Sequence, residues 1–179
     1  MKKLIIAAAM VCAAAFAQAA TVNWSISNVK ADGGGAPTAG WAVMAFYTEV
    51  GAGSAAIESA IASKTAGSLA FESTTLAVSL SKGKVNAHDA TAAGITDTSK
   101  NYDFYFVVFN NADATKATQY TVASALDLAY SSMDSKFKGS GNFSGASWSD
   151  VPAPVIPEPT TGLLVLLGVA GLALRRKRA

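Results

Sequence analysis

Two apolar runs with basic flanks lie at opposite ends of the chain and restrict its water-soluble fold to the residues between them. The first run, Leu4 to Phe16, follows Met1-Lys2-Lys3, and the second, Gly162 to Leu174, precedes Arg175-Arg176-Lys177-Arg178. Lysine and arginine beside a membrane segment favour the cytoplasmic side. We therefore expect both ends to start on the inside and the middle of the chain to be exported.

The N-terminal run predicts a secretory signal peptide, residues 1–19. Its apolar stretch of about a dozen residues is too short to cross a hydrocarbon core of about 30 Å as a helix. It ends in the small-residue pattern Ala17-Gln18-Ala19-Ala20, and we expect cleavage between Ala19 and Ala20. Cys12 raises the alternative of a lipoprotein signal, but Val11 stands before it where a small residue is needed.

The C-terminal run, residues 162–174, predicts a transmembrane helix. Thirteen apolar residues are more typical of a buried core helix, but here a proline-rich stretch precedes the run and a basic cluster follows it. Thr160, Thr161 and extended arginine side chains bring the segment close to spanning length. The basic residues 175–178 are expected to form a stop-transfer tail.

The charge of the chain changes sign when both ends are set aside. Six of the 14 lysines and arginines lie in these ends, which leaves 8 against 12 acidic residues, a net charge of about −4. An acidic body does not support a nucleic-acid-binding surface.

The motif Pro157-Glu158-Pro159 stands a few residues before the C-terminal apolar run. With that run and the arginine cluster, it resembles the PEP-CTERM sorting domain over residues 157–179. The resemblance implies recognition by an exosortase, a multi-spanning membrane enzyme of the cysteine-protease kind that cleaves near the motif. It also implies a bacterium that makes exopolysaccharide or biofilm matrix, with the chain anchored in the inner membrane before it reaches the cell surface or the extracellular space.

Residues 151–159 (VPAPVIPEP) predict an extended stalk. Proline fixes its own φ and pushes the preceding residue toward extended backbone, so a polyproline-like conformation accessible to a protease is expected. A plain linker to a permanent membrane anchor is the alternative. The Leu-Pro-x-Thr-Gly signal of classical sortases is absent from the sequence, and a GPI signal would lack the basic cluster.

The exported body, residues 20–150, predicts one mainly β domain. It has no cysteine after signal cleavage, so packing and hydrogen bonds must hold it together. Residues 22–26 (VNWSI) alternate between apolar and polar, which favours a half-buried edge or surface strand. Residues 41–47 and 102–109 are apolar on both faces, as central strands are.

Shorter patterns add more strands. Leu76, Val78 and Leu80 alternate with polar or small residues, and the turn at 110–113 (NNAD) is expected to return the chain through residues 119–123 as a hairpin. Together the patterns predict an antiparallel β-sandwich of about six to eight strands.

One short helix is expected within the body. Ser54 can cap a segment in which Ile57 and Ile61 lie one turn apart. Residues 125–133 fit either a helical turn or a strand. The Gly- and Ser-rich residues 139–150 fit a loop or a weak last strand before the stalk.

The body contains no recognisable catalytic motif. His88 is the only histidine, which argues against a zinc enzyme. The many serines of the body allow a serine nucleophile paired with His88. The favoured interpretation is an exposed loop histidine beside Asp89, because the sequence contains no Gly-x-Ser-x-Gly motif. Carboxylates for glycoside hydrolysis must lie about 5–10 Å apart, a distance that the sequence cannot give; the candidates are Glu72, Asp97 and Asp103.

Residues 110–113 also offer oxygen atoms that calcium could use. They lack the glycine and glutamate of an EF-hand loop, so an Asx-type turn is the favoured interpretation. No cofactor or metal is therefore predicted.

Three tryptophans decide whether the body is a sugar-binding module. Such a module would present aromatic rings to solvent across one sheet face. Trp41 is expected in the core, and Trp148 is the one ring that a loop could present, although packing against the end of the sandwich is favoured.

The leading functional hypothesis is a non-catalytic structural or adhesive component of an exopolysaccharide or biofilm layer. Export would use the Sec translocon, and an exosortase would process the tail. A carbohydrate-binding module and a small secreted hydrolase are the alternatives.

Overall fold

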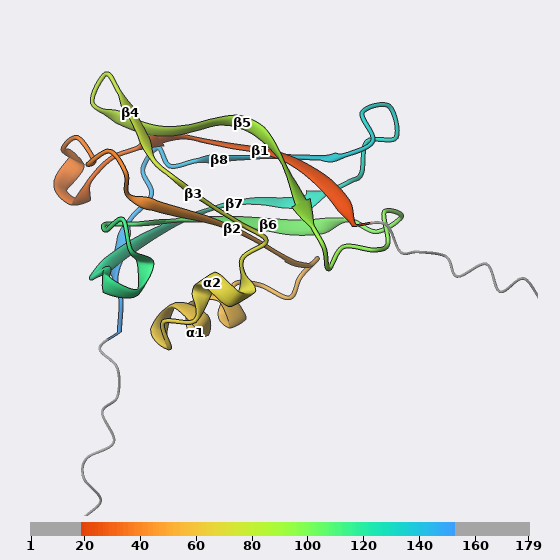
Figure 1. The fold of residues 1–179 in the computed structure, drawn as a ribbon, viewed down its shortest axis with the longest axis horizontal. Coiled ribbons are helices and arrows are strands. Elements are labelled where there is room, and N and C mark those ends of the chain that lie inside the picture. Colours follow the sequence, from red (N-terminus) through yellow and green to blue (C-terminus); the bar gives the residue numbers. More distant parts are fainter. Residues whose placement is uncertain (1–18, 153–179) are drawn as a thin grey trace, which may run out of the picture.

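The computed structural model describes residues 19–152, which form two packed β-sheets with helices on the outer face of one sheet (Figure 1). This confirms a mainly β fold with few helices. The predicted transmembrane helix, the basic tail, most of the signal peptide and the stalk from residue 153 onward lie outside the described residues.

Each sheet combines pairs of consecutive strands with strands that are distant in sequence. The first sheet has the order β4 (Ala77–Ser79), β5 (Lys82–Ala92), β1 (Ala20–Val29) and β8 (Phe137–Asn142). The second has the order β3 (Glu72–Thr75), β2 (Ala42–Glu49), β6 (Tyr102–Phe109), β7 (Gln119–Leu128) and β9 (Trp148–Asp150). The helices are α1 (Ala55–Ala62) and α2 (Ala66–Leu69), and the 3-10 turns are η1 (Asp32–Gly34) and η2 (Ala114–Lys116).

The main core fills the space between the two sheets. Trp24 of β1 stacks on Phe106 of β6 with ring centroids 5.5 Å apart and an interplanar angle of 15°. Both side chains are fully buried. This pair joins the middle of one sheet to the middle of the other.

A second core lies on the opposite face of the five-stranded sheet. Met44 and Phe46 of β2 and Phe109 of β6 pack there against Ile57 and Ile61 of α1. Because β2 and β6 are covered by the other sheet on one side and by helices on the other, their sequences are apolar on both faces. The central-strand interpretation of residues 41–47 and 102–109 agrees with this arrangement.

The described residues contain nine strands rather than six to eight, and two α-helices rather than one. Two of the strands, β4 and β9, have three residues each and sit at sheet edges, where little hydrophobic patterning is needed. The pairing is also not purely antiparallel, because β1 and β8 run parallel. A parallel neighbour requires a long connection, and here most of the domain separates the two strands.

Two strand assignments differ in detail from the sequence-based ones. The alternating strand β1 lies between β5 and β8 and is not an edge. Leu80 does not continue the inward alternation that Leu76 begins, since it is 95% exposed at the β4–β5 turn. Leu80 and Ser81 both have positive φ, 49° and 59°, so the chain reverses there.

Other local predictions agree with the structure. Helix α1 begins after Ser54 and buries Ile57 and Ile61, although the Ser54 hydroxyl donates to the Glu58 carboxylate at 2.6 Å rather than capping a backbone amide. The hairpin from β6 to β7 also forms as expected. The undecided residues 125–133 continue β7 to Leu128.

The close approach of β8 to the core explains the glycines at positions 139 and 141. A Cβ atom on Gly141 would lie 2.7 Å from Cδ2 of Phe106 and 3.2 Å from Cγ2 of Ile26. A Cβ on Gly139 would lie 3.2 Å from Cζ of the same ring. The parallel strand β8 can approach the core ring only because both positions are glycine.

Gly141→Ala is therefore expected to lower the free energy of unfolding by about 1–3 kcal/mol, the usual cost of overpacking a core. Urea denaturation followed by tryptophan fluorescence measures this change. The exposed neighbour Ser140 provides a matched control on the same strand, and Ser140→Ala should leave the midpoint nearly unchanged. Equal midpoints for both variants would contradict the close packing of β8 on Phe106.

Candidate functional site

The predicted sorting residues lie beyond the end of the described chain. Pro157, Glu158, Pro159 and the basic residues 175–178 fall outside residues 19–152. The expected cleavage point lies at the start of the fold: β1 begins at Ala20, which is buried and whose amide donates to the Ile95 carbonyl at 3.0 Å. The folded body thus begins where the signal peptide is expected to end.

The chain leaves the folded body through a firmly attached last strand. Strand β9 pairs with β7, and the Val151 amide then donates to the Thr118 carbonyl at 2.8 Å. Within β9, the indole nitrogen of Trp148 donates to the Lys30 carbonyl at 2.9 Å. The described chain therefore ends at a defined point of the body, next to the segment that follows η2.

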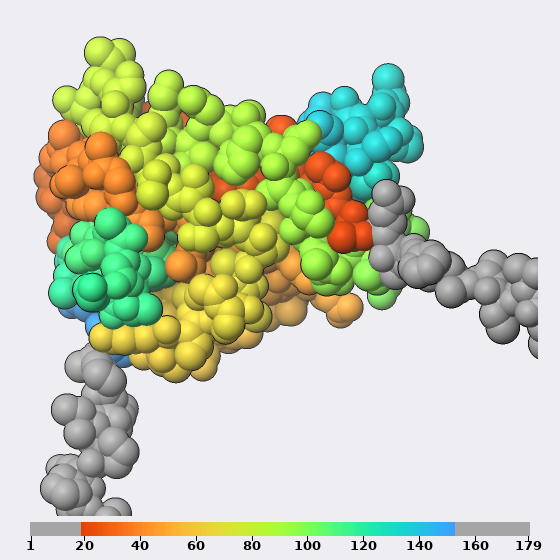
Figure 2. Space-filling model, in the orientation of Figure 1, coloured from red at the N-terminus to blue at the C-terminus, as the bar shows by residue number. Residues whose placement is uncertain are grey.

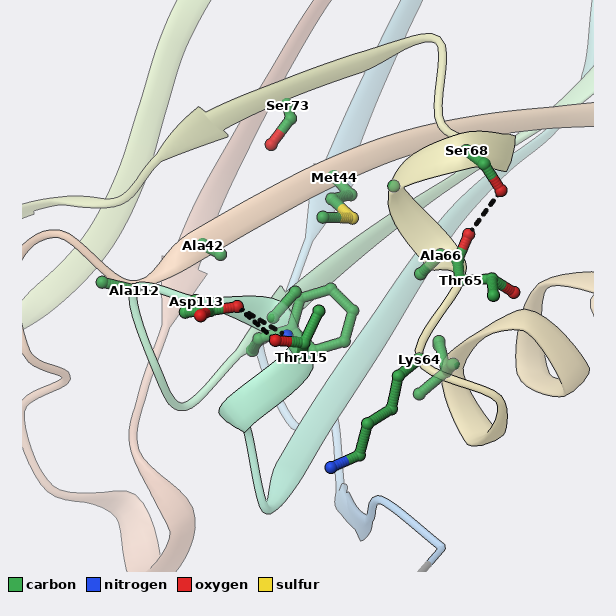
Figure 3. Close-up of a pocket in the computed structure, with 14 residues that line it drawn as sticks. Ala42, Met44, Lys64, Thr65, Ala66, Ser68, Ser73, Ala112, Asp113 and Thr115 are labelled. Atoms are coloured by element: carbon green, nitrogen blue, oxygen red, sulfur yellow. Dashed lines mark hydrogen bonds between the residues drawn. The ribbon is translucent and has the colours of Figure 1, made fainter. Parts of the chain in front are cut away.

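An apolar pocket of about 580 Å³ opens between the helices and the β6–β7 turn. One wall is the α1–α2 segment with α2, the other is the turn with η2, and β2 and the end of β6 form the floor (Figure 3). The lining includes Ala42, Met44, Ile61, Ala66 and Phe109. Figure 2 shows both walls on one side of the molecule, with the blue C-terminal end of the described chain emerging beneath them.

The rim of this pocket carries charges of both signs. Asp113 accepts hydrogen bonds from the Thr115 hydroxyl at 2.7 Å and the Thr115 amide at 3.0 Å, and these bonds lower the pKa of its carboxyl group. Asp113 also forms an ion pair with Lys116. Lys64, on the opposite wall, forms no ion pair within the described part of the chain. It is thus a positive charge available to a ligand.

Sequence reasoning did not identify this pocket. Its lining comes from segments spread over residues 42–115, and the apolar residues that form its floor were interpreted only as strand and helix core. The available signal was that residues 41–47 are apolar on both faces of the strand. A second apolar face must be covered by another part of the chain, and a pocket forms where that cover is incomplete.

His88 is not paired with a serine hydroxyl in the described part of the chain. His88 lies in strand β5 rather than in a loop, and its ring contacts Trp24 with centroids 4.7 Å apart. Its Nδ1 is 3.1 Å from the Asn86 carbonyl oxygen. No serine hydroxyl of the described residues forms a hydrogen bond with His88, so the arrangement of a serine nucleophile and base is not present there.

Two of the three candidate carboxylates have structural partners, and the third, Glu72, lies in β3. Asp103 accepts from the Gly51 and Asp127 amides at 3.0 and 2.8 Å. Asp97 accepts from the Ser99 hydroxyl at 2.6 Å and the Ser99 amide at 3.0 Å, and these bonds lower its pKa. The side-chain oxygens of residues 110–113 are likewise used by nearby backbone amides: Asn110 Oδ1 accepts from the Thr118 and Gln119 amides, and Asn111 Oδ1 accepts from the Asp113 amide. The Asx-type interpretation accounts for them.

The three tryptophans pack within the protein. Trp24 is fully buried. Trp41 and Trp148 are partly buried and meet edge to face, with centroids 5.4 Å apart. Among residues 19–152 no group of three or more histidine, cysteine or acidic side chains is placed to hold a metal ion. No helix of these residues is long and apolar enough to span a membrane.

The outer face of the four-stranded sheet is polar. Alternate residues of β1, β5 and β8 point away from the core, including Asn23, Ser25, Asp89, Lys138, Ser140 and Asn142. Asp89 accepts from Lys136 at 2.9 Å and from Asn23 at 2.6 Å, and these hydrogen bonds lower its pKa. This face offers amide, hydroxyl, carboxylate and ammonium groups side by side.

Comparison with known proteins identifies the tail and not the body. No curated protein and no solved structure is significantly similar to the chain. Residues 155–178 match the family model of the PEP-CTERM protein-sorting motif, which confirms the resemblance drawn from Pro157-Glu158-Pro159. This motif implies export, membrane anchoring before processing and recognition by an exosortase. The chain therefore carries a PEP-CTERM protein-sorting motif at residues 155–178.

Proposed function

We propose that the chain is a cell-surface or extracellular-matrix protein whose folded body is a non-catalytic structural or adhesive component of an exopolysaccharide layer. The sorting motif at residues 155–178 carries the proposal. Residues 1–19 direct export through the Sec translocon, residues 20–150 form the exported domain, and residues 151–159 are the stalk. Residues 162–174 then hold the chain in the inner membrane while the exosortase acts at Pro157-Glu158-Pro159.

The start of the fold supports the assignment of the signal peptide. Strand β1 begins at Ala20, and the residue is buried. Cleavage between Ala19 and Ala20 would leave every strand of the body intact.

The polar face of the four-stranded sheet supports a role in contact with polysaccharide. Hydroxyl, amide and charged groups can exchange hydrogen bonds with sugar hydroxyls. The side chains of Asn23, Asp89 and Lys136 are already held in one hydrogen-bonded network. A rigid polar surface loses little conformational entropy when it binds, which favours many weak contacts along a polymer.

Intact mass spectrometry of the protein recovered from cells tests the processing step. In cells with the exosortase, we expect a chain that starts at Ala20 and lacks the apolar segment and the basic tail. In cells without it, the same chain should keep the tail. The shortened protein should also co-purify with the polysaccharide fraction.

Replacement of both Pro157 and Pro159 by alanine should prevent shortening. The matched control replaces Pro152 and Pro154, which lie in the same stalk but outside the motif, and it should still be shortened. An uncut chain in both strains would reduce the tail to a plain membrane anchor. A shortened chain that stays out of the polysaccharide fraction would contradict the adhesive role alone.

A further inference from the structure

We propose that the apolar pocket between α2 and η2 binds the stalk of its own chain, with Val155 and Ile156 against the pocket floor and Glu158 beside Lys64. The proposal deepens the sorting function and rests on it for the role of the bound segment. Docking would hold the sorting motif at a fixed position on the surface of the folded body.

The exit point of the chain lies beside the pocket. Val151 packs against a hydrophobic cluster that also lines the pocket and includes Met44, Ile61 and Phe109. Its amide is bonded to Thr118, two residues after η2, and η2 forms one wall of the pocket. The stalk therefore starts next to the pocket wall.

The length of the stalk suits this docking. From Val151 to Ile156 an extended chain of five residues spans at most about 17 Å. Val155 and Ile156 are the first two adjacent large apolar residues after the described chain, and prolines stand on both sides of them. Prolines limit the freedom of the unbound stalk, so less entropy is lost when it binds.

The charges of the stalk and the rim are complementary. Glu158 is the only charged residue between Asp150 and Arg175. Lys64 extends from the α1–α2 segment along the edge of the pocket toward the side of η2 (Figure 3). The negative rim residue Asp113 is engaged by Thr115 and Lys116. Binding to Lys64 would cover Glu158 of the motif, so an exosortase would have to displace it before cleavage.

Disulfide cross-linking in the full chain tests the docking. The only cysteine is Cys12, so Cys12→Ser gives a background without thiols. In this background, Ser68→Cys on the pocket rim is combined with Ile156→Cys, which keeps Val155 to bind the floor. The control combines Ile156→Cys with Thr91→Cys, an exposed residue of β5 in the other sheet.

In detergent micelles under mild oxidation, we expect the intramolecular Ser68→Cys/Ile156→Cys bond to form at least about tenfold faster than the control bond, because docking raises the effective concentration of the two thiols. Lys64→Glu should slow the reaction, whereas Lys100→Glu, an exposed lysine outside the pocket, should not.

Equal rates for the two cysteine pairs would overturn the proposal. Disulfide-linked dimers in place of the intramolecular bond would overturn it as well, since the pocket would then hold the stalk of a second copy. The reaction involves no exosortase, so failure of docking and failure of processing are separate results.

Discussion

Phe106→Ala is expected to lower the free energy of unfolding by about 3–5 kcal/mol, the largest effect of any substitution considered for the body. Phe106 is fully buried at the centre of β6. Its ring stacks on Trp24 and lies against the glycines of β8. Alanine would therefore leave a cavity bounded by both sheets, which rigid strands cannot close.

Urea denaturation measures this loss, and Phe106→Leu provides the control. Leucine keeps most of the volume, so we expect a cost well below that of alanine. A similar cost for alanine and leucine would show that the ring itself, and not the filled volume, determines the stability.

A double-mutant cycle with Gly141 checks the same contact from the other strand. In the Phe106→Leu background, Gly141→Ala should cost at least about 1 kcal/mol less than in the natural protein, because residues in direct contact are energetically coupled. The added Cβ would otherwise lie 2.7 Å from the Phe106 ring. Additive costs would indicate that β8 does not depend on this ring.

The strands that lie between two apolar layers were predictable from sequence. Residues 102–109 are apolar or aromatic at every position except Asp103, because β6 packs against Trp24 on one face and against helix α1 on the other. The β6–β7 hairpin was also predictable, since Asn110 accepts from the amides of the returning strand within nine residues. Both features depend on residues that are close together in the sequence, so a short segment is enough to predict them.

Features that depend on distant segments were not predictable. Alternation in residues 22–26 shows that one face of β1 is buried, but not that β5 and β8 flank it. The reversal at Leu80 and Ser81 uses two residues with positive φ and neither is glycine or asparagine, so the usual turn signal is missing. His88 was assigned to a loop because its neighbours are polar, yet it pairs with Trp24 across two strands.

The same distinction between local and distant residues separates the two candidate sites, the sorting motif and the pocket. The sorting motif is a continuous stretch of sequence, so Pro157-Glu158-Pro159 could be recognised without a structure. The pocket combines β2, α2 and the β6–β7 turn. The pocket exists because the helices and the β6–β7 turn cover Met44 and Phe109 only in part. A pattern of apolar residues shows that a face is covered, but not whether the cover is complete.

Asp103→Ala is expected to lower the free energy of unfolding by about 3 kcal/mol, because hydrogen bonds to a charged group contribute about 1.5–3 kcal/mol each and two backbone amides would lose their acceptor. Asp103 is 4% exposed. One of its oxygens accepts from Gly51, after β2, and the other from Asp127, in β7. A single carboxylate thus joins the two strands that flank β6 at their ends.

The bond to Asp127 holds an irregular part of the sheet. The β6–β7 pairing shifts register between Tyr102 and Phe104, and Asp127 has a positive φ of 55°. Asp127 has no paired residue on β6 at this register shift, and its amide donates to the side chain of Asp103. Loss of the carboxylate should therefore loosen the bulge before the rest of the sheet unfolds.

The substitution Asp103→Asn separates the effect of the negative charge from the effect of the side-chain shape. Asp103→Asn keeps one acceptor oxygen but turns an NH₂ group toward a second backbone donor, so we expect most of the alanine cost to remain. Asp89→Ala is the matched control, since it removes an aspartate from the exposed pair with Lys136, and exposed pairs contribute little.

Hydrogen exchange should show faster exchange of the Gly51 and Asp127 amides in both Asp103 variants. Unchanged exchange at these amides would mean that the carboxylate is not their acceptor in solution, and the bulge of β7 would then need another source of stability.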